Sequence, residues 1–146
     1  MNTEQKTVTR SPEETHRVAR ELLETLKPGA VLALHGELGA GKTCFVQGLA
    51  LALGIRRAVS SPTFTLINEY SSAGMRLHHV DLYRIRDSGE ALNLGLDEYI
   101  HGDGITAIEW AERVADLLPA ATIHIRMSAG ESPDERVIVI QRKGPE

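Results

Sequence analysis

The chain has 146 residues, of which 42% are hydrophobic and 25% charged, and its net charge is -4. This length and composition predict one globular domain with a buried core, and no apolar run approaches the roughly 18 residues that a membrane span needs. The first residues are polar and lack the apolar segment of a signal peptide. Cys44 is the only cysteine, which excludes a disulfide framework or a zinc cluster within one chain. We therefore expect a soluble, cytoplasmic protein.

The net negative charge limits which kinds of partner the chain is expected to bind. A protein that binds nucleic acid directly usually presents a basic face. Basic residues cluster here only at residues 56–57 and 142–143, and aromatic residues make up 4% of the chain, too few for a base-stacking platform. Any role in RNA chemistry is therefore expected to be carried out through another protein.

The N-terminal part predicts a short edge strand over residues 5–10 and then a helix. Ser11 suits the cap of that helix, Pro12 suits its first turn, and Glu14 completes a capping box. The helix is expected to end at Pro28. Its buried stripe is predicted to consist of Val18, Leu22, Leu23 and Leu26.

A strand, a glycine-rich loop and a second helix follow. Residues 30–34 form a short apolar run, which is typical of a buried strand, and residues 43–53 fit a helix that stops at Gly54. Residues 36–43 lie between the two and match the phosphate-binding loop G-x-x-x-x-G-K-[ST] without a mismatch. Because this motif requires a strand before it and a helix after it, the context favours a nucleotide site over a chance glycine-rich turn.

Each part of this loop has a physical role. Its glycines let the backbone approach phosphate oxygens closely, and its N–H groups and the start of the helix favour an anion. Lys42 can reach the outer phosphates, and the Thr43 hydroxyl can bind a Mg²⁺ ion that bridges them. Cys44 is most simply a small residue of the helix. We predict that the chain binds a nucleoside triphosphate with Mg²⁺ through Glu37, Leu38, Gly39, Ala40, Gly41, Lys42, Thr43 and Cys44.

The rest of the chain predicts two hairpins with helices and a buried strand between them. In chain order the elements are strands over residues 63–70 and 75–81, a helix over residues 90–100 broken at Gly95, a buried strand over residues 105–108 that leads to Glu109, a helix over residues 111–118, and strands over residues 122–127 and 136–141. This order predicts an α/β fold: a single P-loop NTPase-like domain, residues 1–146, with a mixed sheet, antiparallel hairpins and flanking helices.

Two acidic residues follow predicted strands. Ligands of such sheets lie at the carboxyl ends of the strands, and Mg²⁺ on a triphosphate needs a carboxylate nearby. Glu109 closes a buried strand, so we predict that it is a catalytic residue and, with Thr43, a ligand of Mg²⁺; the alternative is an ordinary acid that faces solvent. Asp81 ends a less apolar strand and is the second catalytic candidate. Either acid can orient the attacking water.

Three other polar or aromatic positions are ambiguous. His78 and His79 are adjacent in a strand and point to opposite faces, so we expect them to pack or form hydrogen bonds rather than bind a metal. Thr63 either senses the outer phosphate, as switch loops do, or simply begins a strand. Trp110 is expected to be a core or interface anchor.

Four segments together strongly resemble the bacterial TsaE (YjeE) ATPases. They are residues 35–43, residues 61–66 (Ser-Pro-Thr-Phe-Thr-Leu), residues 79–84 (His-Val-Asp-Leu-Tyr-Arg) and residues 108–110 (Ile-Glu-Trp). Many families share the phosphate loop, whereas the Ser-Pro-Thr-Phe segment and His-x-Asp-x-Tyr-Arg are much more selective. The match extends from the helix start at Ser11 to Pro119, and it is loose after residue 123.

The resemblance implies that the nucleotide is ATP. Lys42 and Thr43 would hold phosphate and Mg²⁺, Glu109 would be an acid of the magnesium site, and Asp81 would be needed for hydrolysis. The protein would be a weak, partner-stimulated ATPase that acts on the TsaB–TsaD complex during transfer of threonylcarbamoyl to tRNA adenosine. Contact with tRNA would be indirect, in agreement with the acidic composition, and self-association is left open.

Two other functions stay open on the residues alone. A small-molecule kinase would use the same phosphate loop, but it needs an acceptor pocket and an arginine-bearing lid, for which residues 84–86 are the nearest candidate. A non-hydrolysing binding module would use ATP to stabilise a partner complex without releasing phosphate.

Overall fold

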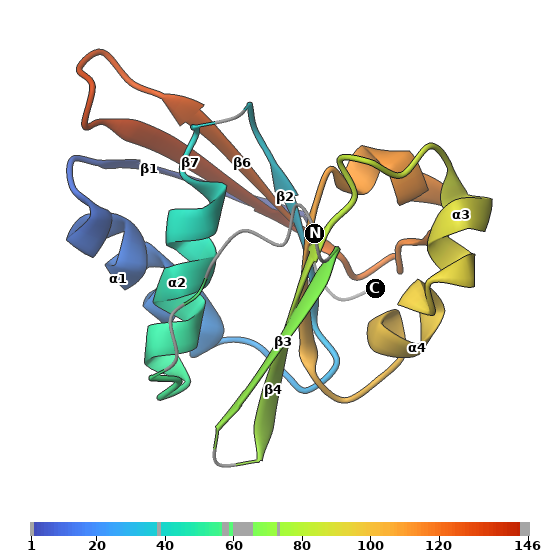
Figure 1. The fold of residues 1–146 in the computed structure, drawn as a ribbon. Coiled ribbons are helices and arrows are strands. Elements are labelled where there is room, and N and C mark those ends of the chain that lie inside the picture. The colour runs from blue at the N-terminus through green and yellow to red at the C-terminus, as the bar shows by residue number, and fades with distance from the viewer. Residues whose placement is uncertain (1, 38, 57–58, 60–65, 73, 144–146) are drawn as a thin grey trace.

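The computed structural model describes residues 2–37, 39–56, 59, 66–72 and 74–143. In chain order its elements are β1 (Thr3–Thr9), α1 (Pro12–Leu23), β2 (Val31–His35), α2 (Lys42–Ala52), β3 (Ile67–Ser72), β4 (Met75–Asp81), α3 (Ser88–Asn93), α4 (Leu96–Ile100), β5 (Ile105–Glu109), the 3-10 helix η1 (Ala111–Leu117), β6 (Ile123–Ala129) and β7 (Arg136–Arg142). The strands form one sheet in the order β1-β7-β6-β2-β5-β4-β3, and helices lie on both of its sides (Figure 1). The predicted α/β class with a mixed sheet and flanking helices is confirmed.

The middle of the sheet is parallel and buried. Strands β6, β2, β5 and β4 run in the same direction. The first four residues of β2 and all five residues of β5 are buried. Strands that are covered on both faces consist of continuous apolar runs rather than alternating ones, which is why the runs at residues 30–34 and 105–108 correctly indicate buried strands.

Antiparallel pairs complete the sheet at its two edges. β3 pairs with β4, β6 pairs with β7, and β1 pairs with β7 along its whole length. Both predicted hairpins are therefore confirmed, and β1 is the expected edge strand, although it begins earlier, at Thr3. The predicted strand that leads into β3 includes residues 63–65, which lie outside the described residues, as does the whole Ser-Pro-Thr-Phe-Thr segment.

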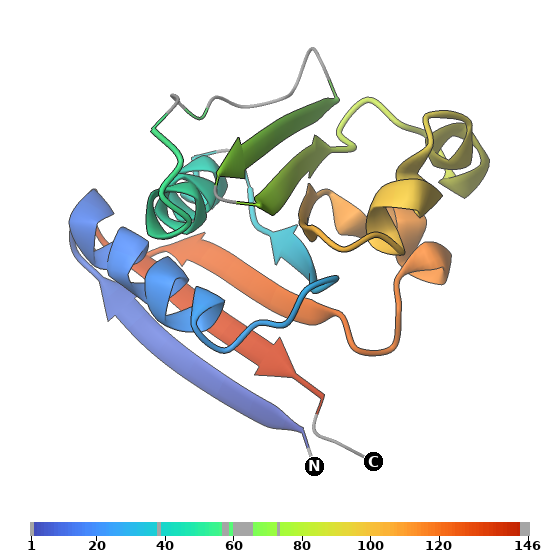
Figure 2. The ribbon, with the colours of Figure 1, turned by 90° about the horizontal axis from the view of Figure 1, so that it is seen from below.

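The helices cover the two faces in separate groups. α1 and α2 pack on one face, where Phe45 and Leu49 of α2 are fully buried with Leu34 of β2. α3, α4 and η1 cover the other face around Val80 and Ile108. Figure 2 shows α1 and α2 side by side, with α3 and α4 at the opposite end of the molecule.

α1 and α2 pack closely at Gly48. A Cβ atom at this position would lie 2.7 Å from the Cα of His16 and 2.9 Å from the Cβ of Ala19. A larger residue would therefore push the helices apart. Because α2 starts at the phosphate loop, this contact also sets where the loop lies.

The start of α1 differs slightly from a capping box. The Glu14 N–H donates to the Ser11 hydroxyl at 3.2 Å, as predicted. The Glu14 carboxylate accepts a hydrogen bond from the backbone N–H of Arg10, one residue before the cap, rather than from the cap itself. Both hydrogen bonds stabilise the start of the helix. The helix ends at Leu23, before Pro28.

Two later helices are interrupted by backbone geometry. The predicted helix over residues 90–100 is divided at Gly95, which has a φ of 82° and begins α4. The segment after Glu109 is a 3-10 helix in which Val114 departs from helical angles. The helix predicted over residues 111–118 is therefore present, but it is not a regular α-helix. None of the described helices is long and apolar enough to cross a membrane.

Candidate functional site

The phosphate loop is pressed against strand β6. Gly36 has a φ of 152° and Gly41 a φ of 104°. A Cβ atom at Gly36 would lie 2.5 Å from the carbonyl oxygen of Met127, and one at Gly41 would lie 3.0 Å from the Cε of the same residue. Both glycines are therefore required by the left-handed backbone or by close approach, as the motif predicts.

The other residues of the loop form a turn at the surface. Glu37 and Gly39 are exposed, and Gly39 has a φ of 82°. Ala40 is buried, and its N–H donates to the carbonyl of Glu37 at 3.0 Å. Leu38 lies outside the described residues, so the prediction that it contacts a nucleotide stays a prediction.

Lys42 is buried at the start of α2, with 5% of its side chain exposed. Its ammonium donates to the carbonyl of Gly36 at 2.6 Å. It also lies 3.8 Å from the Oε1 atom of Glu109 and 4.7 Å from the centre of the Trp110 ring. A cation is thus held between the loop, a carboxylate and an aromatic face. Thr43 follows it in the first turn of α2 and is half-buried.

The two predicted carboxylates lie side by side at the carboxyl ends of neighbouring strands. Asp81 ends β4, Glu109 ends β5, and the two residues are partners in the parallel register. Glu109 is 5% exposed, so the alternative that it faces solvent is wrong, and Asp81 is 3% exposed. One oxygen of Asp81 accepts a hydrogen bond from the backbone N–H of Tyr83 at 2.9 Å.

The adjacent histidines bond to different glutamates, as their opposite orientations predict. The Nε2 atom of His79 lies 2.6 Å from the Oε2 atom of Glu109, whereas the Nε2 atom of His78 lies 3.2 Å from Glu69. The expectation of hydrogen bonding is confirmed. Among the described residues, no group of three or more His, Cys, Asp or Glu side chains could hold a metal ion.

His79 is the residue at this site that the sequence analysis missed. A signal was present, because His79 and Asp81 are two apart in one strand and so share a face. The sequence shows that shared face, but not that the imidazole reaches Glu109 on the neighbouring strand.

Trp110 directly follows β5 and borders the site beside Lys42. It has a left-handed backbone, with a φ of 60°, and its ring packs on Tyr83 with 5.1 Å between the ring centres. The guanidinium of Arg113 lies 5.7 Å from the same ring. The expected anchor role thus takes a specific form: the ring forms one wall beside Lys42.

Cys44 behaves as the small helix residue that was expected. Its Sγ atom lies 3.9 Å from the carbonyl oxygen of Pro12. Burial and the nearby Glu13 raise the pKa of the Cys44 thiol, although Arg136 acts in the opposite direction. The side chain therefore stays a neutral thiol at pH 7.

A histidine pair, formed by His35 at the end of β2 and His124 of β6, lies on the face of the sheet that η1 covers. The Nε2 atom of His35 and the Nδ1 atom of His124 are 2.9 Å apart, and Glu112 lies 3.5 Å from the other nitrogen of His35. Burial, Arg126 and His124 lower the pKa of His35 below its ordinary value of 6.5, against the opposing effect of Glu112. Burial lowers the pKa of His124 as well, with Arg126 and Lys143 adding to the effect.

We expect this pair to make the fold less stable in acid. In the unfolded chain both histidines have ordinary pKa values, so below about pH 6.5 the unfolded chain binds more protons than the folded one. The free energy of unfolding therefore has its full value above about pH 6.5. It decreases as the pH falls from there through the lowered pKa values of the folded state. Thermal melts between pH 8 and pH 5 should show this loss, and it should be smaller in His124→Gln. His101→Gln, at an exposed histidine, is the control; an equal pH dependence in His124→Gln and the wild type would contradict the prediction.

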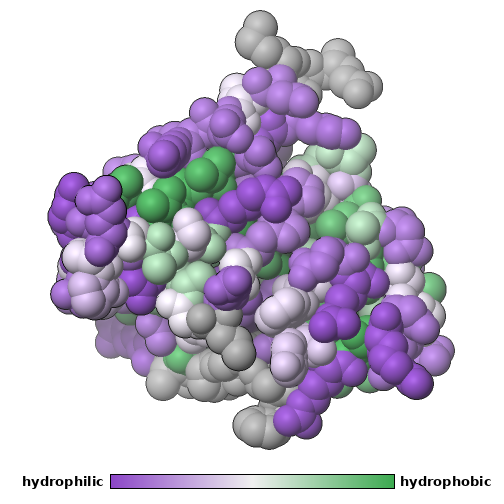
Figure 3. Space-filling view, turned by 90° about the horizontal axis from the view of Figure 1, so that it is seen from above, coloured by the Kyte–Doolittle hydropathy of each residue, from purple (hydrophilic) through white to green (hydrophobic). Residues whose placement is uncertain are grey.

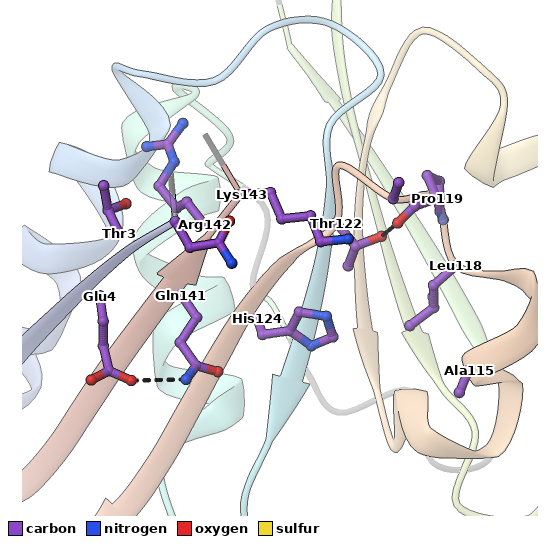
Figure 4. Close-up of a pocket in the computed structure, with 12 residues that line it drawn as sticks. Thr3, Glu4, Ala115, Leu118, Pro119, Thr122, His124, Gln141, Arg142 and Lys143 are labelled. Atoms are coloured by element: carbon purple, nitrogen blue, oxygen red, sulfur yellow. Dashed lines mark hydrogen bonds between the residues drawn. The ribbon is translucent and has the colours of Figure 1, made fainter. Parts of the chain in front are cut away.

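Two hollows on the surface lie away from the loop. One, of about 720 Å³, is bounded by β1, β6, β7 and the segment after η1, and His124 lies on its wall (Figure 4). The other, of about 810 Å³, lies near the start of β4 and contains His78 and Glu69. Among the described residues, no predicted site residue lines either hollow. We place the site at the loop because the buried cation and the carboxylates are there. The end of the molecule that carries the loop is mostly hydrophilic at its surface (Figure 3).

Comparisons with known proteins agree with one another. The family model described as "Threonylcarbamoyl adenosine biosynthesis protein TsaE" matches residues 9–138. A Bacillus subtilis (strain 168) protein named tRNA threonylcarbamoyladenosine biosynthesis protein TsaE is 47% identical over 135 residues, which cover 92% of this chain and 83% of that protein. A Treponema pallidum protein of the same name is 43% identical over 120 residues, covering 82% of this chain and 88% of that protein.

The structural comparison gives the same result. The crystal structure of Bacillus subtilis YdiB is similar to this chain with a TM-score of 0.84 and 41% sequence identity. The similarity covers 99% of this chain and 88% of that one. It therefore includes the C-terminal hairpin, which the sequence resemblance matched only loosely.

Proposed function

The chain belongs to the TsaE family of threonylcarbamoyl adenosine biosynthesis proteins, and on that premise we propose that it is an ATP-binding and ATP-hydrolysing accessory subunit of the machinery that makes N6-threonylcarbamoyladenosine in tRNA. The observation that carries the proposal is the placement of Lys42 and Glu109 together at the phosphate loop, 3.8 Å apart and both buried. A buried ammonium beside a carboxylate and a glycine-rich helix start suits a polyphosphate with a divalent cation.

The donor atoms at this site fit Mg²⁺. This ion prefers oxygen ligands and is held in nucleotide sites by one or two protein oxygens together with phosphates and water. The Thr43 hydroxyl and the Glu109 carboxylate would be those two protein oxygens. When bound, Mg²⁺ would neutralise charge on the phosphates. Lys42 would exchange the carbonyl of Gly36 for an outer phosphate oxygen, and the backbone N–H groups from Glu37 to Cys44 would surround the phosphates.

Hydrolysis requires a group that orients the attacking water. Glu109 and Asp81 are buried carboxylates at the ends of neighbouring strands and are partners in the parallel register, which supports a role for either of them. We propose both as catalytic residues. Comparing turnover in Asp81→Asn and Glu109→Gln would show which of them orients water.

The partner that we propose is the TsaB–TsaD complex, with tRNA contacted only indirectly and the protein acting in the cytoplasm. The names of the relatives support a role in this tRNA modification, and the net charge of -4 suits docking on protein rather than on RNA. ATP turnover would be slow for the chain alone and faster with the partners.

We do not favour the kinase alternative, because Arg86 of the candidate lid is exposed and forms an ion pair with Glu90.

A phosphate-release assay tests the proposal. With Mg²⁺ and ATP, we expect slow release from the chain alone and clearly faster release when purified TsaB and TsaD are added, with no release in EDTA. Binding of ATP without release in either arm would favour the non-hydrolysing module. Faster transfer of phosphate to an added nucleoside, sugar or coenzyme precursor than to water would favour a kinase.

A further inference from the structure

The two oxygens of the Glu109 carboxylate have different partners. Oε2 lies 2.6 Å from the Nε2 atom of His79, a short hydrogen bond. Oε1 lies 3.8 Å from the ammonium of Lys42, too far for a hydrogen bond. The carboxylate is therefore held by the histidine, and its second oxygen points towards the phosphate loop.

The tautomer of His79 follows from its surroundings. The side chain is fully buried, and its Nδ1 atom has no hydrogen-bond partner among the residues that the structure describes. An ionised carboxylate only accepts hydrogen bonds, so the Nε2 atom must carry the proton that it donates. His79 is therefore an Nε2–H donor to Glu109.

The sheet register makes room for this contact. On β5 the residue opposite His79 is Ala107, and Glu109 lies two positions further, opposite Asp81. Ala107 is fully buried on the same face. Its methyl group leaves the space across which the imidazole reaches the carboxylate.

We propose that His79 is a positioning residue for Glu109: its imidazole fixes the carboxylate so that Oε1 stays available to Mg²⁺ and does not collapse onto Lys42. Without the histidine, a buried carboxylate and ammonium only 3.8 Å apart would form a direct charge-assisted bond. That bond would occupy both the metal-binding oxygen and the cation that phosphate needs. The inference rests on the proposed function, because it assigns His79 a role towards the same nucleotide site.

The test separates nucleotide binding from the Mg²⁺ requirement. Binding of a non-hydrolysable ATP analogue is measured by calorimetry in EDTA. In a separate sample without EDTA, Mg²⁺ is titrated while the fluorescence of Trp110, the only tryptophan, is followed. For His79→Phe we expect the half-saturating Mg²⁺ concentration to rise by about 10- to 100-fold, the usual effect of removing a residue that orients a metal ligand. His79→Gln, whose side-chain N–H can still donate, should recover most of this loss.

The matched control is the neighbouring histidine. His78 is also buried and also bonds a glutamate, but on the opposite face of the sheet. His78→Phe should therefore leave the Mg²⁺ requirement at its wild-type value. An unchanged requirement in His79→Phe, with normal binding by the wild type, would overturn this inference alone, whereas a wild type that binds no nucleotide would overturn the proposed function as well.

A measurement on the unaltered protein guards against variants that do not fold. The ¹⁵N NMR spectrum of the His79 side chain should show a ring protonated at Nε2. A ring protonated at Nδ1 alone cannot donate to Glu109 and would overturn the proposal. If His79→Phe fails to fold, His79→Leu is the smaller substitution that removes the same donor.

Discussion

Replacement of Lys42 by alanine is expected to cause a large loss of affinity for ATP. The side chain is the buried cation of the loop, and a charge-assisted contact of this kind contributes about 3 kcal/mol, which corresponds to a loss of about 10²-fold in affinity. Calorimetry with ATP and Mg²⁺ measures this directly. An alanine variant that binds ATP with the wild-type dissociation constant would refute the assignment of the phosphate site.

The stability of this variant needs a control, because Lys42 also faces a buried carboxylate. Removing the ammonium leaves Glu109 with His79 as its hydrogen-bond partner, and an uncompensated buried charge is destabilising. The double variant with Lys42→Ala and Glu109→Gln should recover stability in thermal melts without recovering ATP binding. Recovery of binding in the double variant would mean that Lys42 acts only through the fold.

Replacement of Glu109 by glutamine is expected to leave ATP binding intact and to lower turnover by at least ~10²-fold, the usual scale for losing one positioned catalytic group. Glutamine keeps the volume of the side chain and an oxygen that can accept from His79, but it lacks the charge that Mg²⁺ requires. Alanine at the same position should lower turnover similarly and also leave the His79 donor unpaired. Single-turnover phosphate release, measured with the partner proteins present, provides the rate.

A nearby acid shows whether the effect is local. Glu112 lies three residues further along the chain and is 55% exposed. Glu112→Gln removes the same charge from the same segment, and its turnover should stay close to the wild-type rate. Normal turnover in Glu109→Gln, or an equal loss in Glu112→Gln, would remove Glu109 from the proposed mechanism.

Much of the fold could be predicted because its signals are local. The apolar runs that become β2 and β5 read as buried strands, and Gly36 and Gly41 mark a loop that needs special backbone angles. The segment after Trp110 was harder to predict, because helical periodicity does not reveal that Val114 adopts a non-helical conformation. The bond from Arg10 to Glu14 was missed for a similar reason, since a capping pattern shifted by one residue looks the same in sequence.

The site was only partly predictable. The sequence indicated that Lys42, Thr43, Asp81 and Glu109 lie at ends of strands or helices, but strand order and register decide whether they meet. The contact between His79 and Glu109 joins residues 30 positions apart. It exists because β4 and β5 are parallel neighbours in one specific register, and no local pattern encodes that register.

The sequence by itself determined the phosphate loop, the buried strand before it, the helix after it and the acids that end two strands, because each depends on backbone conformation or burial within a few residues. Only the tertiary structure decided that the two oxygens of Glu109 are divided between His79 and Lys42, and that Trp110 forms the wall beside them. Those contacts join three separate segments of the chain, at Lys42, at His79 and at Glu109 with Trp110. Their geometry follows from how the strands align and how α2 packs, which is a property of the whole sheet.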